Sequence, residues 1–557
     1  MTISGFVRRV LSYIDRHGLS HTVRRAWEKA CDRIFLRYER LWRATRTTEE
    51  VLQYMRRTPI HDGVGLFSIL VPVYNTEPSF LRALAESFRA QTYPVWEACL
   101  YDGMSTRPET IAVLDELAQA DSRFKVVHGT ANDGISGNTN HALEMATGEW
   151  IALCDHDDLY EPDALYRMAE YIRNLQPDML YSDEDFIDAS GKVHTSPHFK
   201  PDFCPDTLRS GNYICHLMVM RRSLLKSIGG FRPETDGSQD HDVALRISEK
   251  TDKIVHVPHV LYHWRQFGGS MSHQQLERCL NAGARAVEEH IARIGYPGKV
   301  THKNAQLRIA YDIDRTASVR LVILHDQADG DVKRSPALTG GMPDRAVVTD
   351  VRKYTGSPWH ALNEAAQAAQ EDYIVFMSSR IAMQGNSWLD ELQMYAQRSD
   401  VGAAGAMIVN LRGRVVHAGF AVRMEGLAQC RSLNVAAKNG GWHGILNTTH
   451  NVEALGLGCV MVRRETLQEN PVNDAYEEGL CMVDWSLRLG VKKLRHVLVP
   501  FATGVCGNRA FADKYLLTGK SRHDDDRKRC SSRWVNATDH CYSERFNRQK
   551  ANYTARL

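Results

Sequence analysis

The residues best suited to chemistry lie in one short acidic stretch, Asp155-His156-Asp157-Asp158. It directly follows the apolar run from Trp150 to Cys154, which has the length and composition of a buried strand. Carboxylates this close together repel one another, so a cation usually lies among them. Oxygen ligands suit Mg²⁺ or Mn²⁺, and such an ion commonly binds the phosphates of a substrate. Many acidic loops are merely solvated, so the neighbouring residues decide the interpretation.

The elements that would position this loop alternate between strands and helices. Apolar runs predict strands at 68–74, 96–101, 124–128 and 150–154. Amphipathic stretches between them predict helices at 80–91, 110–120 and 137–146. Repeated units of this kind imply a mainly parallel, doubly wound α/β sheet, in which ligands bind beyond the carboxyl ends of the strands. Tyr74, Asn75 and Asp102 follow predicted strands, so we expect them to share a crevice with the acidic loop.

Size and composition narrow the class of protein. A chain of 557 residues is too long for one ordinary core, so two main domains with appendages are expected. A net charge of +2 gives no case for nucleic-acid binding. The 12 cysteines form no C-x-x-C pair, which indicates neither a zinc site nor a disulfide framework and fits a reducing cytoplasm. No apolar run is long enough to span a bilayer, and no signal peptide is expected at the N-terminus.

The first 64 residues are rich in arginine and have helical periodicity. Two interpretations remain open for this basic arm. It is either an amphipathic helix on the cytoplasmic face of the inner membrane, or a helical arm packed on the rest of the chain or on a second copy. The packed arm is favoured, because the pattern lacks a large aromatic anchor face.

The segment from Phe67 to Ser272 resembles the family 2 glycosyltransferases with the Rossmann-like GT-A fold. The resemblance rests on four motifs in the family's order, at 67–75, 153–158, 236–242 and 262–265. The stretches at 198–203 and 211–217 resemble the branch that builds bacterial surface polysaccharides of the O-antigen or rhamnan type. The resemblance implies inverting transfer of a sugar from a nucleoside-diphosphate sugar to a growing surface glycan.

The resemblance also assigns roles to residues around the acidic loop. A nucleoside diphosphate leaves readily only if its developing charge is neutralised, so a Mn²⁺ or Mg²⁺ ion held by Asp157 and Asp155 is expected. Asp155 is alternatively a ribose contact. His263 is the expected further metal ligand, and Arg265 the expected clamp on the diphosphate.

Inversion requires a base on the face opposite the leaving group, and Asp240 aligns with the family's base. Asp242 either orients the site or caps a helix expected at 243–250.

The nucleoside pocket is expected at the ends of the first two strands. By resemblance, Asp102 would hydrogen-bond the nucleobase, and Pro72, Tyr74 and Asn75 would line the same pocket. The turn at 132–136 opens a helix whose amides either face the donor or form an ordinary turn and cap. The stretch 182–185 is either a contact to the donor sugar or a solvent-exposed loop.

A second α/β segment looks like a degenerate copy of the first. Ser378, Ser379 and Arg380 stand where the acidic motif is expected, and an arginine there would repel a metal ion. Met482 and Cys506 replace a later acid and a histidine. The predicted organisation is therefore a basic helical arm (1–64), a catalytic GT-A domain (65–315), a degenerate GT-A-like domain (316–507) and a polar tail (508–557).

Three other functions compete with transfer to a surface glycan. A nucleotidyltransferase would need a Gly-rich phosphate loop, which the sequence after Tyr74 does not provide. A non-catalytic glycan-binding or scaffold protein of a polysaccharide-assembly complex is disfavoured by the intact Asp155, Asp157, Asp240 and His263. A protein glycosyltransferase would differ only in its acceptor. The expected partners are the nucleotide-sugar donor, a free or lipid-linked glycan acceptor and polysaccharide-assembly proteins.

Overall fold

The computed structural model describes residues 42–43, 46–58, 60, 63–267, 276–303, 306–327, 349–422, 428–518, 523–546 and 551–553. Most of the predicted basic arm lies outside the described residues, as do the last residues of the family-like segment, 268–272. Before the first sheet, helix α3 (Glu49–Arg57) begins after Thr48, whose hydroxyl accepts a hydrogen bond from the Val51 amide. Among the described residues, no helix combines the length and apolarity needed to cross a membrane.

The first sheet has the strand order β3-β2-β1-β4-β8-β6-β9-β5, with β7 added beside β6. Its strands are β1 (Phe67–Val73), β2 (Trp96–Asp102), β3 (Phe124–His128), β4 (Trp150–Leu153), β5 (Leu159–Tyr160), β6 (Met179–Ile187), β7 (His194–His198), β8 (Met218–Arg221) and β9 (Ile254–Arg265). Strands β1 to β4 pair in parallel, as the sequence predicts, and β8 joins antiparallel to β4.

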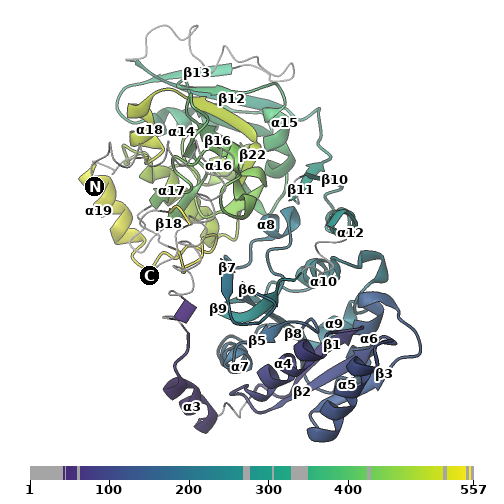
Figure 1. Ribbon diagram of the computed structural model, residues 1–557. Coiled ribbons are helices and arrows are strands. Elements are labelled where there is room, and N and C mark those ends of the chain that lie inside the picture. The colour runs from purple at the N-terminus through teal and green to yellow at the C-terminus, as the bar shows by residue number, and fades with distance from the viewer. Residues whose placement is uncertain are drawn as a thin grey trace, which may run out of the picture.

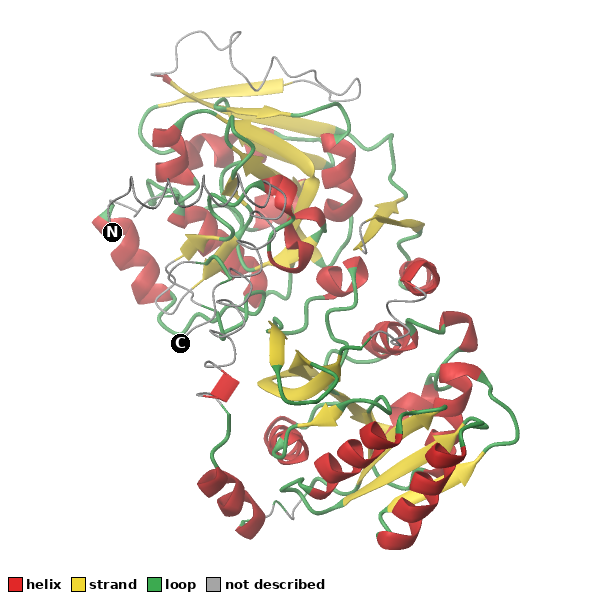
Figure 2. Ribbon diagram, in the orientation of Figure 1, coloured by secondary structure: helices red, strands yellow, loops and turns green. Residues whose placement is uncertain are grey.

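Helices cover both faces of this sheet (Figure 2). The helices of the first half are α4 (Pro78–Arg89), α5 (Pro108–Ala120), α6 (Gly134–Met145), α7 (Ala164–Leu175), α8 (Pro205–Ser210), α9 (Arg222–Ser227), α10 (Gln239–Ser248) and α12 (Leu276–Arg293). Of these, α8 lies between the two halves, and α12 packs on α10 and on the hairpin that follows it. Alternate residues of β1 enter different cores: Ile69 and Val71 pack in the cluster that holds α4, α5 and α7, whereas Leu70 packs with α6 and α10. Burial on both faces explains why β1 is apolar at nearly every position.

The second sheet repeats the connections of the first, in the order β13-β12-β14-β21-β16-β22-β15. Its strands are β12 (Val319–Asp326), β13 (Thr349–Tyr354), β14 (Tyr373–Ser378), β15 (Ile381–Met383), β16 (Val401–Val409), β17 (Val415–His417), β20 (His450–Val452), β21 (Cys459–Arg463) and β22 (Arg495–Cys506). Reading from β2 and from β13, the neighbouring pairs are parallel or antiparallel in the same sequence. The chain therefore contains two GT-A-like folds in tandem, and the predicted fold class is confirmed.

Further elements surround and connect the two sheets. The hairpin β10 (Gly298–Lys303) and β11 (Gln306–Tyr311) precedes the second sheet, and β18 (Phe420–Val422) pairs with β19 (Ala428–Cys430). The helices of the second half are α14 (Pro358–Ala368), α15 (Trp388–Ala396), α16 (Arg464–Glu469) and α17 (Leu480–Val491). They are followed by α18 (Arg509–Tyr515) and α19 (Asp524–Arg533).

The short helix α8 joins the two halves (Figure 1). Asp206 on α8 is buried and ion-paired with Arg398, which is fully buried in the second half. Asn451 completes the contact: its side chain donates to Asp206 Oδ2 at 3.0 Å and accepts from the Asp206 amide at 2.8 Å. Despite burial, Arg398 holds the pKa of Asp206 far below its usual value. The two halves are thus fixed to each other through a buried charge pair.

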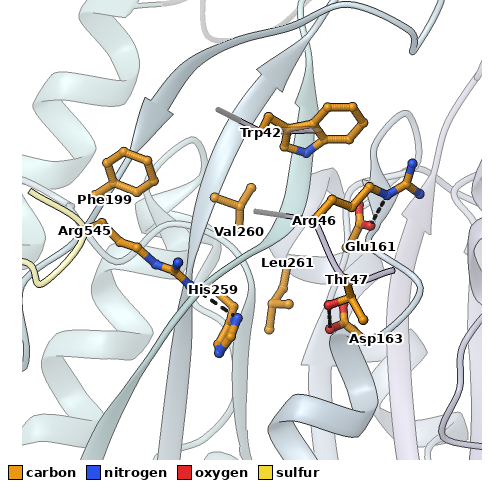
Figure 3. Close-up of a pocket in the computed structure, with 10 residues that line it drawn as sticks. All are labelled: Trp42, Arg46, Thr47, Glu161, Asp163, Phe199, His259, Val260, Leu261 and Arg545. Carbon is orange, nitrogen blue, oxygen red and sulfur yellow. Dashed lines mark hydrogen bonds and ion pairs between the residues drawn. The ribbon is translucent and has the colours of Figure 1, made fainter. Parts of the chain in front are cut away.

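Both ends of the described chain pack on the first half (Figure 3). Arg46 Nε lies 2.6 Å from Glu161 Oε1, and the Thr47 hydroxyl donates to Asp163 Oδ2 at 2.6 Å. Arg545 donates to the carbonyl of Pro258 at 2.6 Å. Together they enclose a small cavity of about 50 Å³. The charged residues at 523–526 stabilise the C-terminal helix. The His523 side chain caps α19, and the buried carboxylate of Asp526 accepts hydrogen bonds from two backbone amides.

Candidate active site

The acidic loop lies at the carboxyl end of β4, against the last residues of strand β9. Its third carboxylate, Asp158, is fully buried and accepts from the Tyr262 hydroxyl at 2.5 Å and from the Arg265 amide at 2.7 Å. Burial raises the pKa of Asp158 well above its usual value. Asp158 therefore anchors the loop, and Asp155 and Asp157 are the half-buried carboxylates that remain for a ligand.

Asp155 lies where three other elements converge. Its amide donates to the Tyr262 hydroxyl at 3.1 Å, and its Oδ2 lies 3.8 Å from His216 Nε2. Burial raises the pKa of Asp155, His216 opposes this shift, and the charges of Asp157 and Asp240 add to it. The structure thus brings Asp155, Asp157 and Asp240 into one site, although β4 and α10 are far apart in the sequence.

His216 is a site residue to which the sequence assigns no role. Its ring stacks on Tyr262 at 4.5 Å and lies edge-on to Trp264 at 5.7 Å. Its amide donates to Glu184 Oε2 at 2.9 Å. Its Nδ1 is buried with no hydrogen-bond partner among the described residues. The only signal in the sequence is its position inside the family-like stretch 211–217.

The two aspartates of the α10 motif have different environments. Asp240 Oδ2 accepts a hydrogen bond from Asn212 Nδ2 at 2.7 Å, and Asp240 is half-buried on the side of Asp155. Asp242 is fully buried and pairs with Arg232 Nη2 at 2.5 Å and Arg246 Nη2 at 2.6 Å. Neither aspartate is the N-cap residue of α10. Asp242 therefore stabilises the helix, and Asp240 is the one that faces the site.

His263, the expected further metal ligand, lies beside β6 and two carboxylates of the fold. His263 is buried, and both of its ring nitrogens are occupied: Nδ1 lies 2.6 Å from Asp185 Oδ1 and Nε2 lies 2.9 Å from Glu161 Oε2. Although burial opposes the charge, the two carboxylates raise the pKa of His263 to about 10. His194 also contacts Asp185, at 2.9 Å, and the ligand atoms of Asp185, His194 and His263 lie within 4.8 Å of one another. This buried group therefore holds either a proton, as the raised pKa indicates, or a metal ion in its place.

Arg265 also differs from its expected role as a diphosphate clamp. Its Nε donates to the Asp157 carbonyl at 2.6 Å and its Nη1 to the Ala189 carbonyl at 2.9 Å. The guanidinium lies over the Phe80 ring at 4.5 Å and is buried, and burial lowers its pKa. In this structure Arg265 holds the acidic loop through its bond to the Asp157 carbonyl, while its buried Nη2 has no hydrogen-bond partner among the described residues.

The stretch 182–185 is a buried part of β6 and not an exposed loop. Glu184 accepts from the His216 amide, lies 3.0 Å from His198 Nδ1 and lies 3.3 Å from Lys200 Nζ. Burial alone would raise its pKa, but Lys200 and His198 lower the pKa of Glu184 to about 2. The carboxylate is therefore an ionised support for the backbone beside His216. It is not placed as a direct sugar contact.

The predicted nucleoside residues gather where β1 and β2 end side by side, since Val73 pairs with Asp102. Pro72 is buried within β1, and Tyr74 is exposed to 44%. Asn75 Oδ1 accepts from the Thr106 amide at 2.8 Å, so its side chain ties the two strand ends together.

Asp102 lies at the same edge, with both carboxylate oxygens engaged. Oδ1 accepts from the Ser105 amide at 2.9 Å and Oδ2 lies 2.9 Å from His128 Nδ1. The hydrogen bond to Asp102 raises the pKa of His128. The turn at 132–136 is contacted by a carboxylate of the protein itself, because the Ser136 amide donates to Asp236 Oδ1 at 3.1 Å.

The corresponding edge of the second sheet has different residues. Strand β14, which takes the place of β4, ends at Ser378 and is followed by Ser379 and Arg380. Asp484 on α17 is fully buried, with its carboxylate 3.0 Å from Arg488 Nε and accepting from the Trp534 indole at 2.9 Å. This aspartate is therefore used within the fold.

Part of the first half matches a known protein family. Residues 68–229 match the model of glycosyl transferase family 2. The chain is 33% identical over 484 residues to the uncharacterized protein y4gI of Sinorhizobium fredii, covering 78% of this chain and 52% of that protein. It is 30% identical over 494 residues to the O-antigen biosynthesis protein RfbC of Myxococcus xanthus, covering 82% of this chain and 38% of that protein. The chain thus spans about half or less of the length of these relatives.

A solved structure, that of S. aureus TarS 1-349 in complex with UDP, is also similar, with a TM-score of 0.34 and 21% identity over 41% of this chain and 65% of that chain. The residues that match the family model, 68–229, include most of β1, the acidic loop and the loop that carries Asn212 and His216. Residues 68–229 of this chain thus form a glycosyl transferase family 2 domain.

Proposed function

We propose that the chain is an inverting, metal-dependent glycosyltransferase that moves a sugar from a nucleoside-diphosphate sugar to a bacterial surface glycan. The observation that carries the proposal is the convergence of Asp155, Asp157 and Asp240 at the carboxyl edge of the strands of a family 2 domain. Open α/β sheets bind their ligands at this edge. The similarity to a protein named for O-antigen biosynthesis supports a surface glycan as the acceptor.

The residues of the loop fit a divalent cation. Within the described part of the chain, the carboxylates of Asp155 and Asp157 accept no hydrogen bond, and histidine nitrogens lie 3.8–3.9 Å from each. The Nδ1 atoms of His156 and His216 are buried without partners, which is unusual unless a ligand completes the site. Asp155 and Asp157 would hold the ion, with His216 as the nearest further donor. When bound, Mn²⁺ or Mg²⁺ would neutralise the charge that develops on the departing diphosphate.

Asp240 is the proposed general base. Asp240 takes the proton of the acceptor hydroxyl as its oxygen attacks the anomeric carbon and the bond from that carbon to the diphosphate breaks. Because the attack comes from the face opposite the diphosphate, the configuration at the anomeric carbon is inverted. The hydrogen bond from Asn212 fixes the direction of the carboxylate. His216 lies 3.8 Å from Asp155 and edge-on to Trp264 on the same side of the site.

The substitution Asp240→Asn tests this assignment. We expect kcat to fall by about 10²- to 10⁴-fold, because the amide cannot accept the proton, while the donor still binds. Release of nucleoside diphosphate from the sugar donor measures the rate. Asp252→Asn is the matched control, since Asp252 lies just beyond α10 and its side chain is 76% exposed. Full activity in Asp240→Asn would contradict the assignment.

The proposal extends to the organisation of the chain. Residues 65–315 would form the catalytic domain and 316–507 a degenerate copy that has lost metal-dependent transfer. The matching order of the two sheets and the residues Ser378, Ser379 and Arg380 in place of acids support this division. The second half would then buttress α8, which leads directly into the loop that carries Asn212.

A further inference from the structure

A cavity of about 240 Å³ lies between the two halves, beside the proposed base. Aromatic rings from three parts of the chain line it: Phe199, Tyr213, Trp442, Tyr542, Phe546 and Tyr553. Many of these rings pack on one another, with Trp442 edge-on to Phe546 at 5.2 Å and Phe199 edge-on to Phe546 at 5.5 Å. Trp442 is only partly buried, so part of its ring remains open to the cavity.

Amide and hydroxyl side chains lie between the aromatic rings of the cavity wall. Asn212, Asn451 and Thr448 line the cavity, and Gln306 reaches it from the hairpin β10–β11. Asn212 also donates to Asp240, so one residue of the lining contacts the proposed base directly. A molecule that fills the cavity would therefore lie against the side chain that holds the carboxylate of Asp240.

The charges of the lining residues indicate what kind of molecule fits. Among the described residues, the lining contains no aspartate, glutamate or lysine. Its arginine, Arg431, is buried, and its donors already serve the Tyr553 hydroxyl and the Asn451 carbonyl. A basic ligand would find no carboxylate among these residues, and an acidic ligand would have to displace the hydrogen bonds of Arg431 to pair with it. A neutral, hydroxyl-rich ligand meets no such cost.

We propose that this cavity is the acceptor subsite and holds a neutral oligosaccharide, a conclusion that rests on the function proposed above. A sugar ring presents an apolar face of C–H groups and a rim of hydroxyls. The faces would pack on Trp442 and its aromatic neighbours, and the hydroxyls would bond to Asn451 and Thr448. Both halves contribute walls, so the second half serves the reaction by completing the acceptor site.

Two substitutions test the proposal from opposite directions. Trp442→Ala removes an aromatic wall. Gly211→Leu adds bulk to the lining at a position where a new Cβ meets no atom within 4 Å, so the fold can accept it. The matched control is Tyr54→Ala, which removes an aromatic side chain that is 63% exposed on α3. Thermal unfolding of each variant checks that the full chain is folded.

Saturation-transfer NMR measures binding of neutral rhamnose, mannose and glucose oligosaccharides, with a chondroitin hexasaccharide as the acidic probe. We expect a neutral probe to bind the wild type and Tyr54→Ala equally, and about tenfold or more weakly to both cavity variants. The proposal is overturned if cavity variants bind like the control, if the acidic probe binds best, or if no neutral probe binds. Nucleoside-diphosphate binding in the same samples separates the two claims: glycan binding without it would contradict the proposed transfer but keep the cavity as a glycan site.

Discussion

His263 is the residue whose environment departs most from its sequence motif. A proton held between Asp185 and Glu161 stabilises the fold, since a pKa of about 10 lies far above the usual value of roughly 6.5. This stabilisation is complete below about pH 6.5 and is lost as the pH rises towards 10. We therefore expect the free energy of unfolding to fall over this alkaline range, as measured by urea denaturation.

The substitution His263→Gln should flatten that pH dependence and lower the free energy of unfolding by up to about 3–5 kcal/mol, because it removes the cation that Asp185 and Glu161 share and leaves them only His194 and Arg46. His360→Gln, which changes a histidine with a 70% exposed side chain, should do neither. An unchanged pH dependence in His263→Gln would show that the proton resides elsewhere.

Asn212 is expected to act as a positioning residue for Asp240. Asn212→Ala removes the 2.7 Å hydrogen bond and frees the carboxylate to rotate. We expect kcat to fall by roughly 10- to 100-fold, with the KM for the donor unchanged, because misplacing a reacting group costs rate and not donor binding. Steady-state kinetics of the variant give both values. The exposed Asn174→Ala should match the wild type, and a raised donor KM with normal kcat would argue against the role.

At the same scale, the sequence predicts a set of site residues but not which of them lie close together. Asp155, Asp157 and Asp240 lie in one site, whereas the side chains of His263 and Arg265 contact other residues of the fold. The side chains that β9 presents to a neighbour depend on its register with β5 and β6, where His263 lies opposite Leu159 and Asp185. Register is a tertiary property, and no local motif records it.

At the scale of elements, the apolar strands are predictable and the polar strand β6 is not. β1, β2, β3 and β4 are each recognisable as short apolar runs. Four polar residues in a row at 182–185 suggest an exposed loop, because carboxylates are rarely buried without partners. Here the partners come from distant segments, such as Lys200 and His256, which lies 2.8 Å from Asp183. Only the folded arrangement shows that the burial is compensated.

Helix α8 provides a test of the contact between the halves. Asp206→Ala leaves Arg398 buried without its main partner, and we expect the free energy of unfolding to fall by about 3–5 kcal/mol. Denaturant unfolding measures this loss, and Glu116→Ala, which breaks an exposed pair with Arg82, should cost about 0–1 kcal/mol. If the two variants lose the same small amount, α8 does not hold the halves together.

At the scale of the whole molecule, the tandem arrangement explains how a second half without the acidic motif can contribute to the proposed site. Its similarity to the first half is visible in the sequence as a repeated α/β pattern, but the contacts of α8 with Arg398 and Asn451 join residues about two hundred positions apart. The shared aromatic cavity likewise depends on how the halves dock. Neither feature follows from local patterns, because both are set by packing between halves.

The proposed function requires one metal-dependent nucleotide site per chain, in the first half. Isothermal titration calorimetry with a panel of nucleoside diphosphates and their sugars, with and without Mn²⁺, measures this binding. We expect one nucleotide to bind with a stoichiometry of one and only with Mn²⁺, and we expect Asp157→Ala to abolish binding while Ser378→Ala in the second half does not. Binding that is indifferent to Mn²⁺ and to Asp157, or no binding to any member of the panel, would contradict the proposed function.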